Sequence, residues 1–348
     1  MIRRILLSIL PMLSLLFMSG CLETEEYTND PYGNFDALAE IIDTRYCFFE
    51  EKGVDWDEVT RRYRARLSDD MTILELFNLL SEMLDELRDG HVNLSSKFNT
   101  SRYMNWWSDY PADFDYRTLR EYYLDFDYMT TSGMIYKVLD GNIGYIYYPS
   151  FSTTVSPLAL DYVLAYLHEC DGIILDIRDN GGGLLTNIDT LVGRFITSEV
   201  PGGAITHKNG PGHDDFSEPY SFSYEPADPS RRITYSGPIA LLINHGCYSA
   251  ANAFAAVMRT LPQVTLIGAT TGGGAGLPAS YELPNGWLIR LSASPLYDPA
   301  GQLTEFGVAP SPGFECHSPD EDLARGVDAI LDRAMDYLRS LTASASYM

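Results

Sequence analysis

The segment Asn244–Ala251, NHGCYSAA, contains the residue best suited to covalent chemistry, Ser249. An apolar run, IALLIN, precedes this segment, and AANAFAAVMRTL, which is typical of a helix, follows it. A serine in a sharp turn from a strand into a helix points out of the sheet edge, beside free N–H groups of the helix. Such a serine can attack a carbonyl carbon. The alternative is a plain helix N-cap, a position that serine favours.

A run of three glycines is the second chemical candidate. GIILDIRDNGGG predicts a buried strand that leads into Asn180 and the glycines at 181–183. Backbone N–H groups with no Cβ nearby suit an oxyanion hole or an anion site. A phosphate loop is not indicated, because neither G-x-G-x-x-G nor a following Lys-Ser/Thr is present. The ordinary alternative is a tight turn.

Three further side chains could assist a nucleophile, and each has a simpler explanation. His91 follows Gly90 at the end of a predicted helix, where a histidine favours the helix C-terminus electrostatically. Glu305 lies in the loop GQLTEFGVAPS, and loop glutamates are usually solvated. His245, four residues before Ser249, is an alternative base, although its place at a strand end favours packing.

Hydrophobic patterning predicts the elements that must position these residues, beginning with an N-terminal helical domain over residues 34–93. Asn34 is the predicted N-cap of its first helix. Thr72 and Glu75 form a capping box for a second helix with a leucine stripe, and Gly90 is its predicted C′ residue. Residues 94–135 are aromatic and weakly periodic, so we expect a connecting or lid segment there.

Residues 136–341 predict an α/β core. Strands are expected at 142–148, 172–177, 239–244, 264–268 and 287–291, and helices at 157–170, 187–196 and 250–261. This alternation predicts strands that are buried on both faces. The segment Ser318–Glu321 forms a capping box with proline at N1, which predicts a final helix that extends to Leu338.

The N-terminus has the features of an export signal. Arg3 and Arg4 precede an apolar stretch that is short for a membrane span and ends at small residues. Met18–Cys21, MSGC, resembles a bacterial lipobox, so we expect residues 1–20 to be a lipoprotein signal peptide and Cys21 to be lipidated. An ordinary signal cleaved nearby is the alternative. Residues 21–33 would form a polar tether, and the chain would be lipid-anchored to a bacterial membrane, facing the periplasm or the cell exterior.

Charge and cysteine content exclude several classes of partner. The formal net charge is −24, and removal of residues 1–20 takes away two arginines and no acid, which leaves −26. Such a chain would repel phosphate backbones, so no nucleic acid partner is expected. The overall acidity is compatible with basic substrates, although the sequence does not place these charges at the site. The cysteines at 47, 170, 247 and 316 lack paired C-x-x-C spacing, so no metal site or cofactor is indicated.

The segments GHVN, LDIRDNGGG, NHGCYSAANAF followed by LIGATTGGGAG, and TEFGVAP occur together in this order. Over about residues 31–340 the sequence therefore resembles the carboxyl-terminal processing (tail-specific) peptidases, whose relatives include the tricorn protease core and the interphotoreceptor retinoid-binding modules. The resemblance implies a crotonase/ClpP-like β-β-α core in an exported enzyme that acts on peptides. A PDZ domain normally precedes this core, but residues 95–135 are too few for one, so we expect none.

One departure from the family pattern assigns a branch. Many members use a Ser-Lys dyad, but Gly274 stands at the lysine position and no lysine follows Ser249. The chain is similar instead to the tricorn-like branch, which uses a histidine and a downstream glutamate, and His91 and Glu305 stand at those positions. The resemblance implies that Ser249 attacks, that His91 is the general base and that Glu305 orients its ring.

The backbone N–H groups of Gly181, Gly182 and Ala250 would form the oxyanion hole in this arrangement. The predicted function is therefore a membrane-tethered serine endopeptidase that works through an acyl-enzyme, with activity falling below about pH 6 as the histidine protonates. One alternative is a catalytically decayed binding lipoprotein, supported by the missing lysine and by Asn252, where the family often has an acid. A serine esterase with the same residues is another. The oligomeric state is not indicated.

Overall fold

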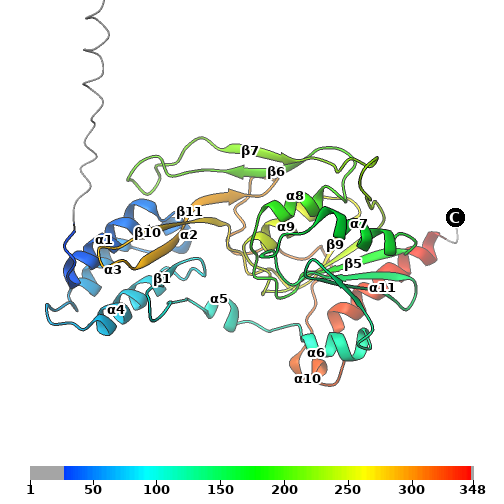
Figure 1. Ribbon diagram of the computed structural model, residues 1–348, viewed down its shortest axis with the longest axis horizontal. Helices are drawn as coiled ribbons and strands as arrows, with labels where there is room; N and C mark the ends of the chain where they lie inside the picture. The colour runs from blue at the N-terminus through cyan, green and yellow to red at the C-terminus, as the bar shows by residue number, and fades with distance from the viewer. Residues whose placement is uncertain (1–26, 346–348) are drawn as a thin grey trace, which may run out of the picture.

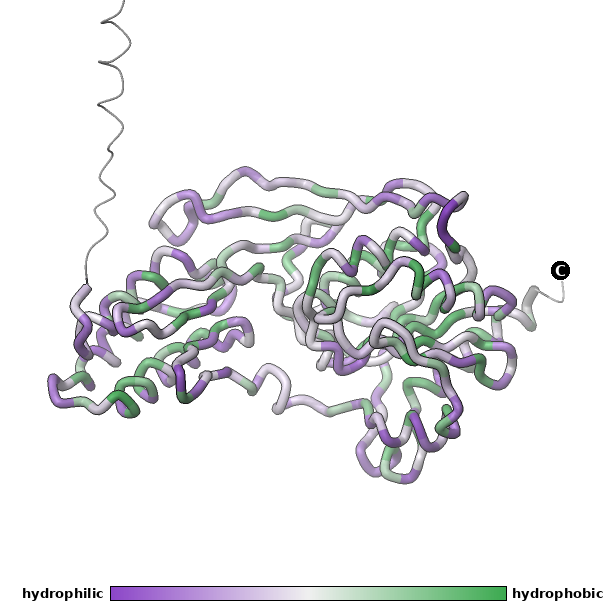
Figure 2. Tube along the Cα trace, in the orientation of Figure 1, coloured by the Kyte–Doolittle hydropathy of each residue, from purple (hydrophilic) through white to green (hydrophobic). Residues whose placement is uncertain are grey.

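The computed structural model describes residues 27–345 and shows two units side by side, joined by long strands (Figure 1). The predicted signal peptide, Cys21 and the first part of the predicted tether lie outside the described residues. No helix within residues 27–345 is long and apolar enough to cross a membrane. Apolar segments gather in the sheet of the larger unit and along the inner helices of the smaller one, while the outer loops are polar (Figure 2).

The smaller unit combines N-terminal helices with strands from distant parts of the chain. Its elements are α1 (Pro31–Arg45), α2 (Phe49–Lys52), α3 (Trp56–Arg64), α4 (Ile73–Asp85), β1 (Asn93–Ser95), β10 (Gly276–Glu282) and β11 (Leu288–Tyr297). One apolar core joins helix residues such as Phe35 and Leu80 to Trp287 and Ile289. The predicted strand at 287–291 therefore exists, but it completes the N-terminal unit instead of the α/β core.

Helix ends in this unit differ from the expectation at two places. The N-cap of α1 is Asp30, whose Oδ1 accepts a hydrogen bond from Gly33 N, and Asn34 is buried within the helix. The predicted capping box of α4 is present, but this helix ends at Asp85. Gly90 does not cap it. A Cβ at Gly90 would lie 2.6 Å from the indole nitrogen of Trp106, so a glycine is required there by close packing.

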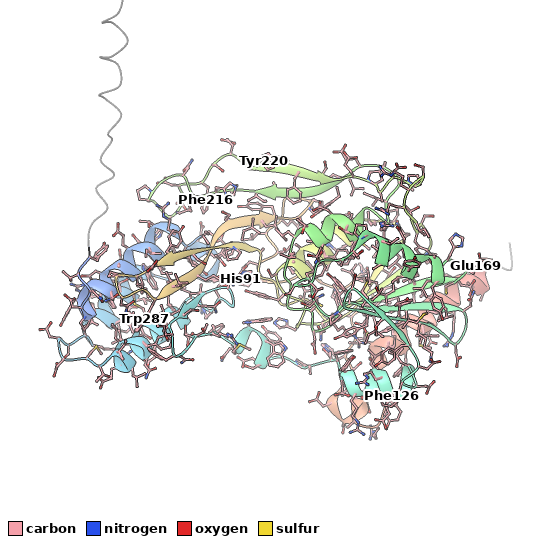
Figure 3. All side chains as sticks on the ribbon, viewed as in Figure 1. His91, Phe126, Glu169, Phe216, Tyr220 and Trp287 are labelled. Carbon is pink, nitrogen blue, oxygen red and sulfur yellow. The ribbon has the colours of Figure 1, made fainter. Side chains whose placement is uncertain are left out.

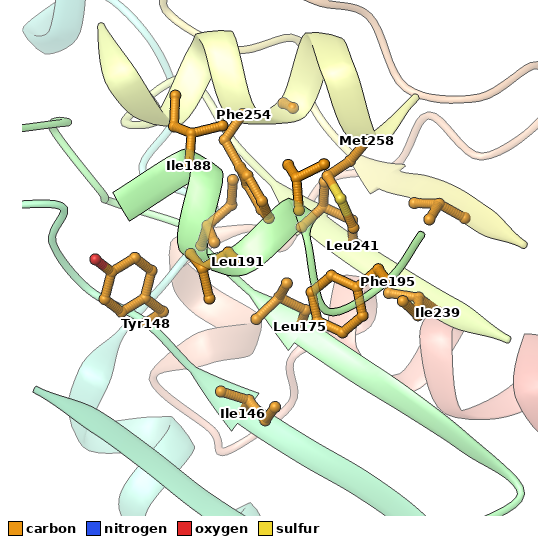
Figure 4. Packing of buried hydrophobic residues seen from close by; sticks show 14 of the residues in the cluster. Ile146, Tyr148, Leu175, Ile188, Leu191, Phe195, Ile239, Leu241, Phe254 and Met258 are labelled. Atoms are coloured by element: carbon orange, nitrogen blue, oxygen red, sulfur yellow. The ribbon is translucent and has the colours of Figure 1, made fainter. Parts of the chain in front are cut away.

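The larger unit contains a six-stranded sheet in the order β2-β3-β4-β5-β8-β9, in which β4, β5, β8 and β9 are parallel. Its strands are β2 (Met129–Thr131), β3 (Met134–Leu139), β4 (Ile143–Tyr147), β5 (Gly172–Asp176), β8 (Ile239–Ile243) and β9 (Val264–Gly268). Helices α7 (Pro157–Tyr166), α8 (Thr186–Val192) and α9 (Ala250–Met258) cover one face, where Phe254 and Leu191 pack on Leu175 and Leu241 (Figure 4). The other face packs against α11 (Ala329–Ala345).

A second sheet, in the order β1-β11-β6-β7, links the two units. The start of β11 pairs with β1 and β10 in the N-terminal unit, and its end pairs with β6 (Val200–Ile205), which pairs with β7 (Tyr220–Tyr224). Figure 1 shows β6 and β7 running across the top of both units. The relative placement of the units is thus fixed by continuous hydrogen-bonded strands.

The remaining segments are short. Between β1 and β2 the chain forms α5 (Asn105–Ser108), α6 (Tyr116–Thr118) and the π-helix η1 (Leu119–Tyr123), with α5 lying along the gap between the two units in Figure 1. The predicted final helix is split into α10 (Asp320–Leu323) and α11, because Gly326 adopts a φ of 86°. Ser318 accepts a hydrogen bond from Ile330 N, so it helps to cap α11 instead of α10.

Candidate active site

Ser249 occupies the turn between β8 and α9 in a strained backbone conformation, with φ 55° and ψ −119°. Its N–H donates to Gly273 O at 2.8 Å, and its carbonyl accepts from Ala253 N at 2.9 Å. Such a conformation costs about 1–3 kcal/mol and persists only where the surroundings enforce it. An N-cap serine has an extended backbone and its hydroxyl accepts from the helix. The Ser249 hydroxyl caps nothing, so the plain N-cap interpretation fails.

The glycine run packs directly against this serine. A Cβ on Gly182, whose φ is 91°, would lie 2.8 Å from Ser249 Cβ and 2.8 Å from Ala250 N. Only a residue without a side chain allows this approach. The carbonyl of Gly182 accepts a hydrogen bond from Phe151 N at 3.0 Å, which holds the run in place. The glycines therefore do more than make a tight turn.

The three predicted oxyanion donors are not equivalent. The N–H of Gly182 already donates to Asn180 Oδ1 at 3.0 Å. The N–H groups of Gly181 and Ala250 donate no hydrogen bond within residues 27–345. Of the three predicted donors, the N–H groups of Gly181 and Ala250 are therefore available to an oxyanion, whereas the N–H of Gly182 is occupied by Asn180.

His91 comes from the other unit, on the loop between α4 and β1, and Figure 3 shows it facing the gap between the units. His91 and Ser249 line the same cavity of about 430 Å³, together with Gly181 and Gly182. The ring is 4.9 Å from that of Tyr248, and its Nδ1 has no hydrogen-bond partner within the described part of the chain. The structure thus brings the predicted nucleophile and base to one site.

Burial, together with the positive charges of Arg290 and Lys52, lowers the pKa of His91 to about 4, against the raising effects of Asp89 and of a hydrogen bond with the Gly276 backbone. The ring is therefore neutral at neutral pH and can accept a proton. This pKa differs from the ordinary histidine value behind the expected loss of activity below pH 6, because only 4% of the residue is exposed.

Glu305 does not contact His91 in the described structure. Its Oε1 lies 2.8 Å from Lys52 Nζ, and its Oε2 accepts a hydrogen bond from Ala275 N at 2.8 Å. Burial and then Asp89 raise the pKa of Glu305 to about 7, against the lowering effects of Lys52 and the Ala275 N–H. The predicted contact that would orient the histidine ring is therefore replaced by a buried ion pair.

Asp89, which the sequence reasoning missed, is a buried carboxylate whose charge raises the pKa of His91. Its carboxylate accepts hydrogen bonds from His91 N at 2.8 Å, Ser292 Oγ at 2.9 Å and Tyr46 Oη at 3.0 Å. Burial alone would raise the pKa of Asp89, but Lys52, His91 and these bonds hold it below its usual range. Its place two residues before His91, in RDGH, was the available signal.

At Gly274, where the sequence resemblance would place a lysine, an aromatic ring occupies the space beside the backbone. A Cβ on Gly274 would lie 2.4 Å from the Tyr248 ring, which stacks on Trp106 with centroids 4.2 Å apart. Because Tyr248 directly precedes Ser249, this stack also packs beside the nucleophile. A side chain at 274 would have no room in this arrangement.

Two other reactive side chains close to Ser249 in sequence, His245 as a possible base and Cys247 as a possible nucleophile, make contacts elsewhere. The His245 ring stacks on Tyr110 with centroids 3.5 Å apart, and His245 is not among the described residues that line the Ser249 cavity. Cys247 is fully buried, and its Sγ donates to Ile177 O at 2.9 Å. Burial raises the pKa of the Cys247 thiol, which disfavours the thiolate that a nucleophile requires.

Comparisons with known proteins agree with this geometry. Residues 142–311 match the model of Peptidase family S41, and residues 27–85 match the Tricorn protease C1 domain. A candidate peptidase from Parabacteroides merdae, whose crystal structure is known, is 45% identical; the match covers 89% of this chain and 97% of that chain with a TM-score of 0.84.

The curated relatives are longer proteins. Carboxy-terminal processing protease CtpA of Bacillus subtilis is 31% identical over 44% of this chain and 31% of its own length. The carboxy-terminal-processing protease of Bartonella bacilliformis is 26% identical over 59% of this chain and 45% of its own. The chain thus spans less than half the length of these relatives.

Similarity to mature CPAF, with a TM-score of 0.64 at 12% identity over 89% of this chain and 95% of that one, shows a shared fold. The predicted fold class, an α/β core with an N-terminal helical region, is confirmed. The family matches, the 45% identical relative and the serine-bearing turn lead to one assignment: the chain belongs to peptidase family S41.

Proposed function

We propose that this chain is an exported, membrane-tethered serine endopeptidase that hydrolyses peptide bonds through an acyl-enzyme at Ser249, with His91 as the general base. One observation carries the proposal. A serine held in a strained turn, with its hydroxyl committed to no helix cap, shares a cavity with a buried histidine whose pKa is low enough to keep it neutral. A nucleophile needs a base in this protonation state.

The proposed reaction follows the residues of the site. Ser249 Oγ attacks the peptide carbonyl as His91 takes its proton, and the N–H groups of Gly181 and Ala250 stabilise the oxyanion, each on the order of 3 kcal/mol. His91 then protonates the leaving amine, which departs and leaves the acyl-enzyme. Water, deprotonated by His91, releases the acid product and restores Ser249. Asp89 stabilises the charged imidazolium during both steps.

Glu305 has a different proposed role, as a positioning residue for the loop that supports the serine. Its carbonyl accepts from Gly274 N at 3.2 Å and its carboxylate from Ala275 N. The same loop provides Gly273 O, the acceptor for Ser249 N. Lys52 neutralises the buried carboxylate. Glu305 therefore acts on Ser249 through backbone geometry rather than through the His91 ring.

The lipid anchor rests on the sequence MSGC before residue 22. Expression with an alkyne-tagged fatty acid tests it. We expect the tag on the intact protein and its loss in Cys21→Ala, with the protein released from the membrane fraction. Tag retained in Cys21→Ala would contradict the anchor at this residue.

Digestion of a broad peptide library tests the activity, with products read by mass spectrometry. The protein without its signal peptide and lipidated cysteine, residues 22–348, is compared with Ser249→Ala and His91→Ala. We expect cleavage by the unmutated protein and none by either variant. Loss of cleavage in Ser249→Ala but not in His91→Ala would indicate that a residue other than His91 is the base. The absence of cleavage by the unmutated protein, with native circular dichroism, would contradict peptidase activity.

A further inference from the structure

The cavity around Ser249 is basic although the protein is strongly acidic. The sequence has 48 acidic and 24 basic residues, yet Arg102 and Arg290 line this cavity and no described Asp or Glu does. The overall acidity is compatible with basic substrates. The location of the charges argues for the opposite preference at the site itself.

Neither arginine has a carboxylate partner. Arg290 is half-buried and donates only a long hydrogen bond, 3.4 Å, to His91 O, and no described carboxylate lies within 4.0 Å of either guanidinium group. The two arginines that are almost fully buried in the described chain are paired. Arg178 contacts Asp176 and Asp328, and Arg194 contacts Asp161. Because removing an unpaired charge from water costs free energy, half-buried Arg290 lacks the compensating carboxylate that these two arginines have.

Both arginines are held in place by the N-terminal unit. Arg290 lies on β11 opposite Asn93 of β1, and Asn93 lines the same cavity. Arg102 follows Ser101, whose N–H donates to Leu94 O at 2.8 Å and whose Oγ accepts from Leu94 N at 3.0 Å. The two cations thus have fixed attachment points on one wall, on the same side as His91.

We propose that Arg290 and Arg102 select substrates with a carboxylate close to the scissile bond. The carboxylate is either an Asp or Glu side chain or the free C-terminus of the peptide. Guanidinium groups bind carboxylates through paired, charge-assisted hydrogen bonds, and the substrate would supply the partner that Arg290 lacks. Burial lowers the pKa of Arg290, which agrees with a desolvated cation awaiting a counter-charge. The inference rests on the proposed function, since it names the substrates of the same site.

The test separates binding from cleavage. Immobilised Ser249→Ala, which cannot turn over substrate, is exposed to a peptide library in matched pairs: Asp against Asn, Glu against Gln, and C-terminal acid against C-terminal amide. Retained peptides are quantified by mass spectrometry. A hydrogen bond to a charged group contributes about 1.5–3 kcal/mol, so we expect roughly 10- to 100-fold tighter binding of the acid member of a pair. The pair type that discriminates identifies the source of the carboxylate.

Arginine variants in the Ser249→Ala background assign the effect. Arg290→Gln should remove most of the discrimination, Arg290→Lys should retain part of it, and the exposed Arg102→Gln should weaken it without affecting folding. Arg117→Gln is the control, because its side chain is 79% exposed and pairs with Glu121 outside the cavity. Thermal unfolding checks each variant. Discrimination that persists in folded Arg290→Gln and Arg102→Gln would overturn the assignment.

Cleavage of the same pairs by the unmutated protein distinguishes this inference from the proposed function. Equal binding and cleavage of acid and neutral members would overturn the inference and leave the peptidase intact. Arginine-dependent binding of acid members without any cleavage would support the inference as a binding preference and contradict the peptidase. Faster cleavage of acid members supports both.

Discussion

The two units contribute to the site in different ways. The α/β core fixes Ser249 by backbone geometry: a positive φ, a hydrogen bond from Ser249 N to Gly273 O, and a glycine packed against the side chain. The N-terminal unit supplies His91 and surrounds it with buried titratable groups, Asp89 and Lys52 among them. Backbone geometry and packing thus fix the position of the Ser249 side chain, whereas neighbouring charges and burial fix the pKa of His91. The first kind of control is steric, and the second depends on pH.

The largest expected effect tests the steric side. Gly182→Ala places a Cβ 2.8 Å from Ser249 Cβ and must displace the serine. Because a misplacement of about 1 Å costs on the order of 10²-fold, we expect kcat/KM to fall by at least about that factor. Gly133→Ala is the control: its φ is 77°, but a Cβ there meets no atom within 4 Å. It should lose about 1 kcal/mol of stability without losing activity. Full activity in Gly182→Ala would contradict the claim that close packing of Gly182 positions Ser249.

The second prediction separates the two buried acids. Asp89→Asn removes the charge that stabilises the His91 imidazolium, an effect on the order of 2 kcal/mol or roughly 30-fold in kcat/KM. Glu305→Gln keeps an acceptor for Ala275 N and should lose about tenfold or less. Removal of the acid from a catalytic triad typically costs roughly 10⁴-fold. A larger loss in Glu305→Gln than in Asp89→Asn would restore Glu305 as the orienting acid.

The third prediction concerns pH. His91 acts in its neutral form, and a pKa of about 4 leaves that form dominant at every pH above this value. Activity should therefore be nearly constant from pH 5 to 6 and fall about tenfold per unit below pH 4. Arg290 lowers the pKa of His91, so Arg290→Gln should move the acid limb to higher pH. The logarithm of kcat/KM against pH measures both, and an acid limb near pH 6.5 in the unmutated enzyme would contradict the buried base.

The smallest expected effect concerns the alternative base. His245 stacks on Tyr110, so His245→Ala should cost about 0.5–1.5 kcal/mol of unfolding free energy. Its effect on kcat should stay within a few-fold, because the ring is not among the described residues lining the cavity. Denaturant titration and steady-state kinetics provide the two values. A loss of kcat as large as that in His91→Ala would indicate that His245, and not His91, is the general base.

The contrast between the units also explains what the sequence could predict. The turn at Ser249 and the glycine run at 181–183 are local, since strand, turn and helix follow each other along the chain. The environment of His91 is assembled from residues far apart, including Lys52 and Ser292. The ion pair between Lys52 and Glu305 joins residues that are far apart in the sequence, so no local sequence pattern predicts it.

Two errors in the fold have the same origin. Composition predicts the strand at 287–291, but its partner sheet depends on the path of the β10–β11 hairpin into the N-terminal unit. The sequence neighbours of Gly90 predict that it ends a helix. Its actual constraint is contact with Trp106, which only the tertiary structure reveals.

The central claim is that His91 of one unit activates Ser249 of the other. A fluorophosphonate probe tests it directly, because it forms a covalent adduct only with an activated serine. The mature protein and folded His91→Ala would be labelled in parallel at pH 7.5, and the adduct located by peptide mass spectrometry. We expect labelling at Ser249 that is at least about 10²-fold slower in His91→Ala. Equal rates in the two proteins, or an adduct at another residue, would contradict the claim.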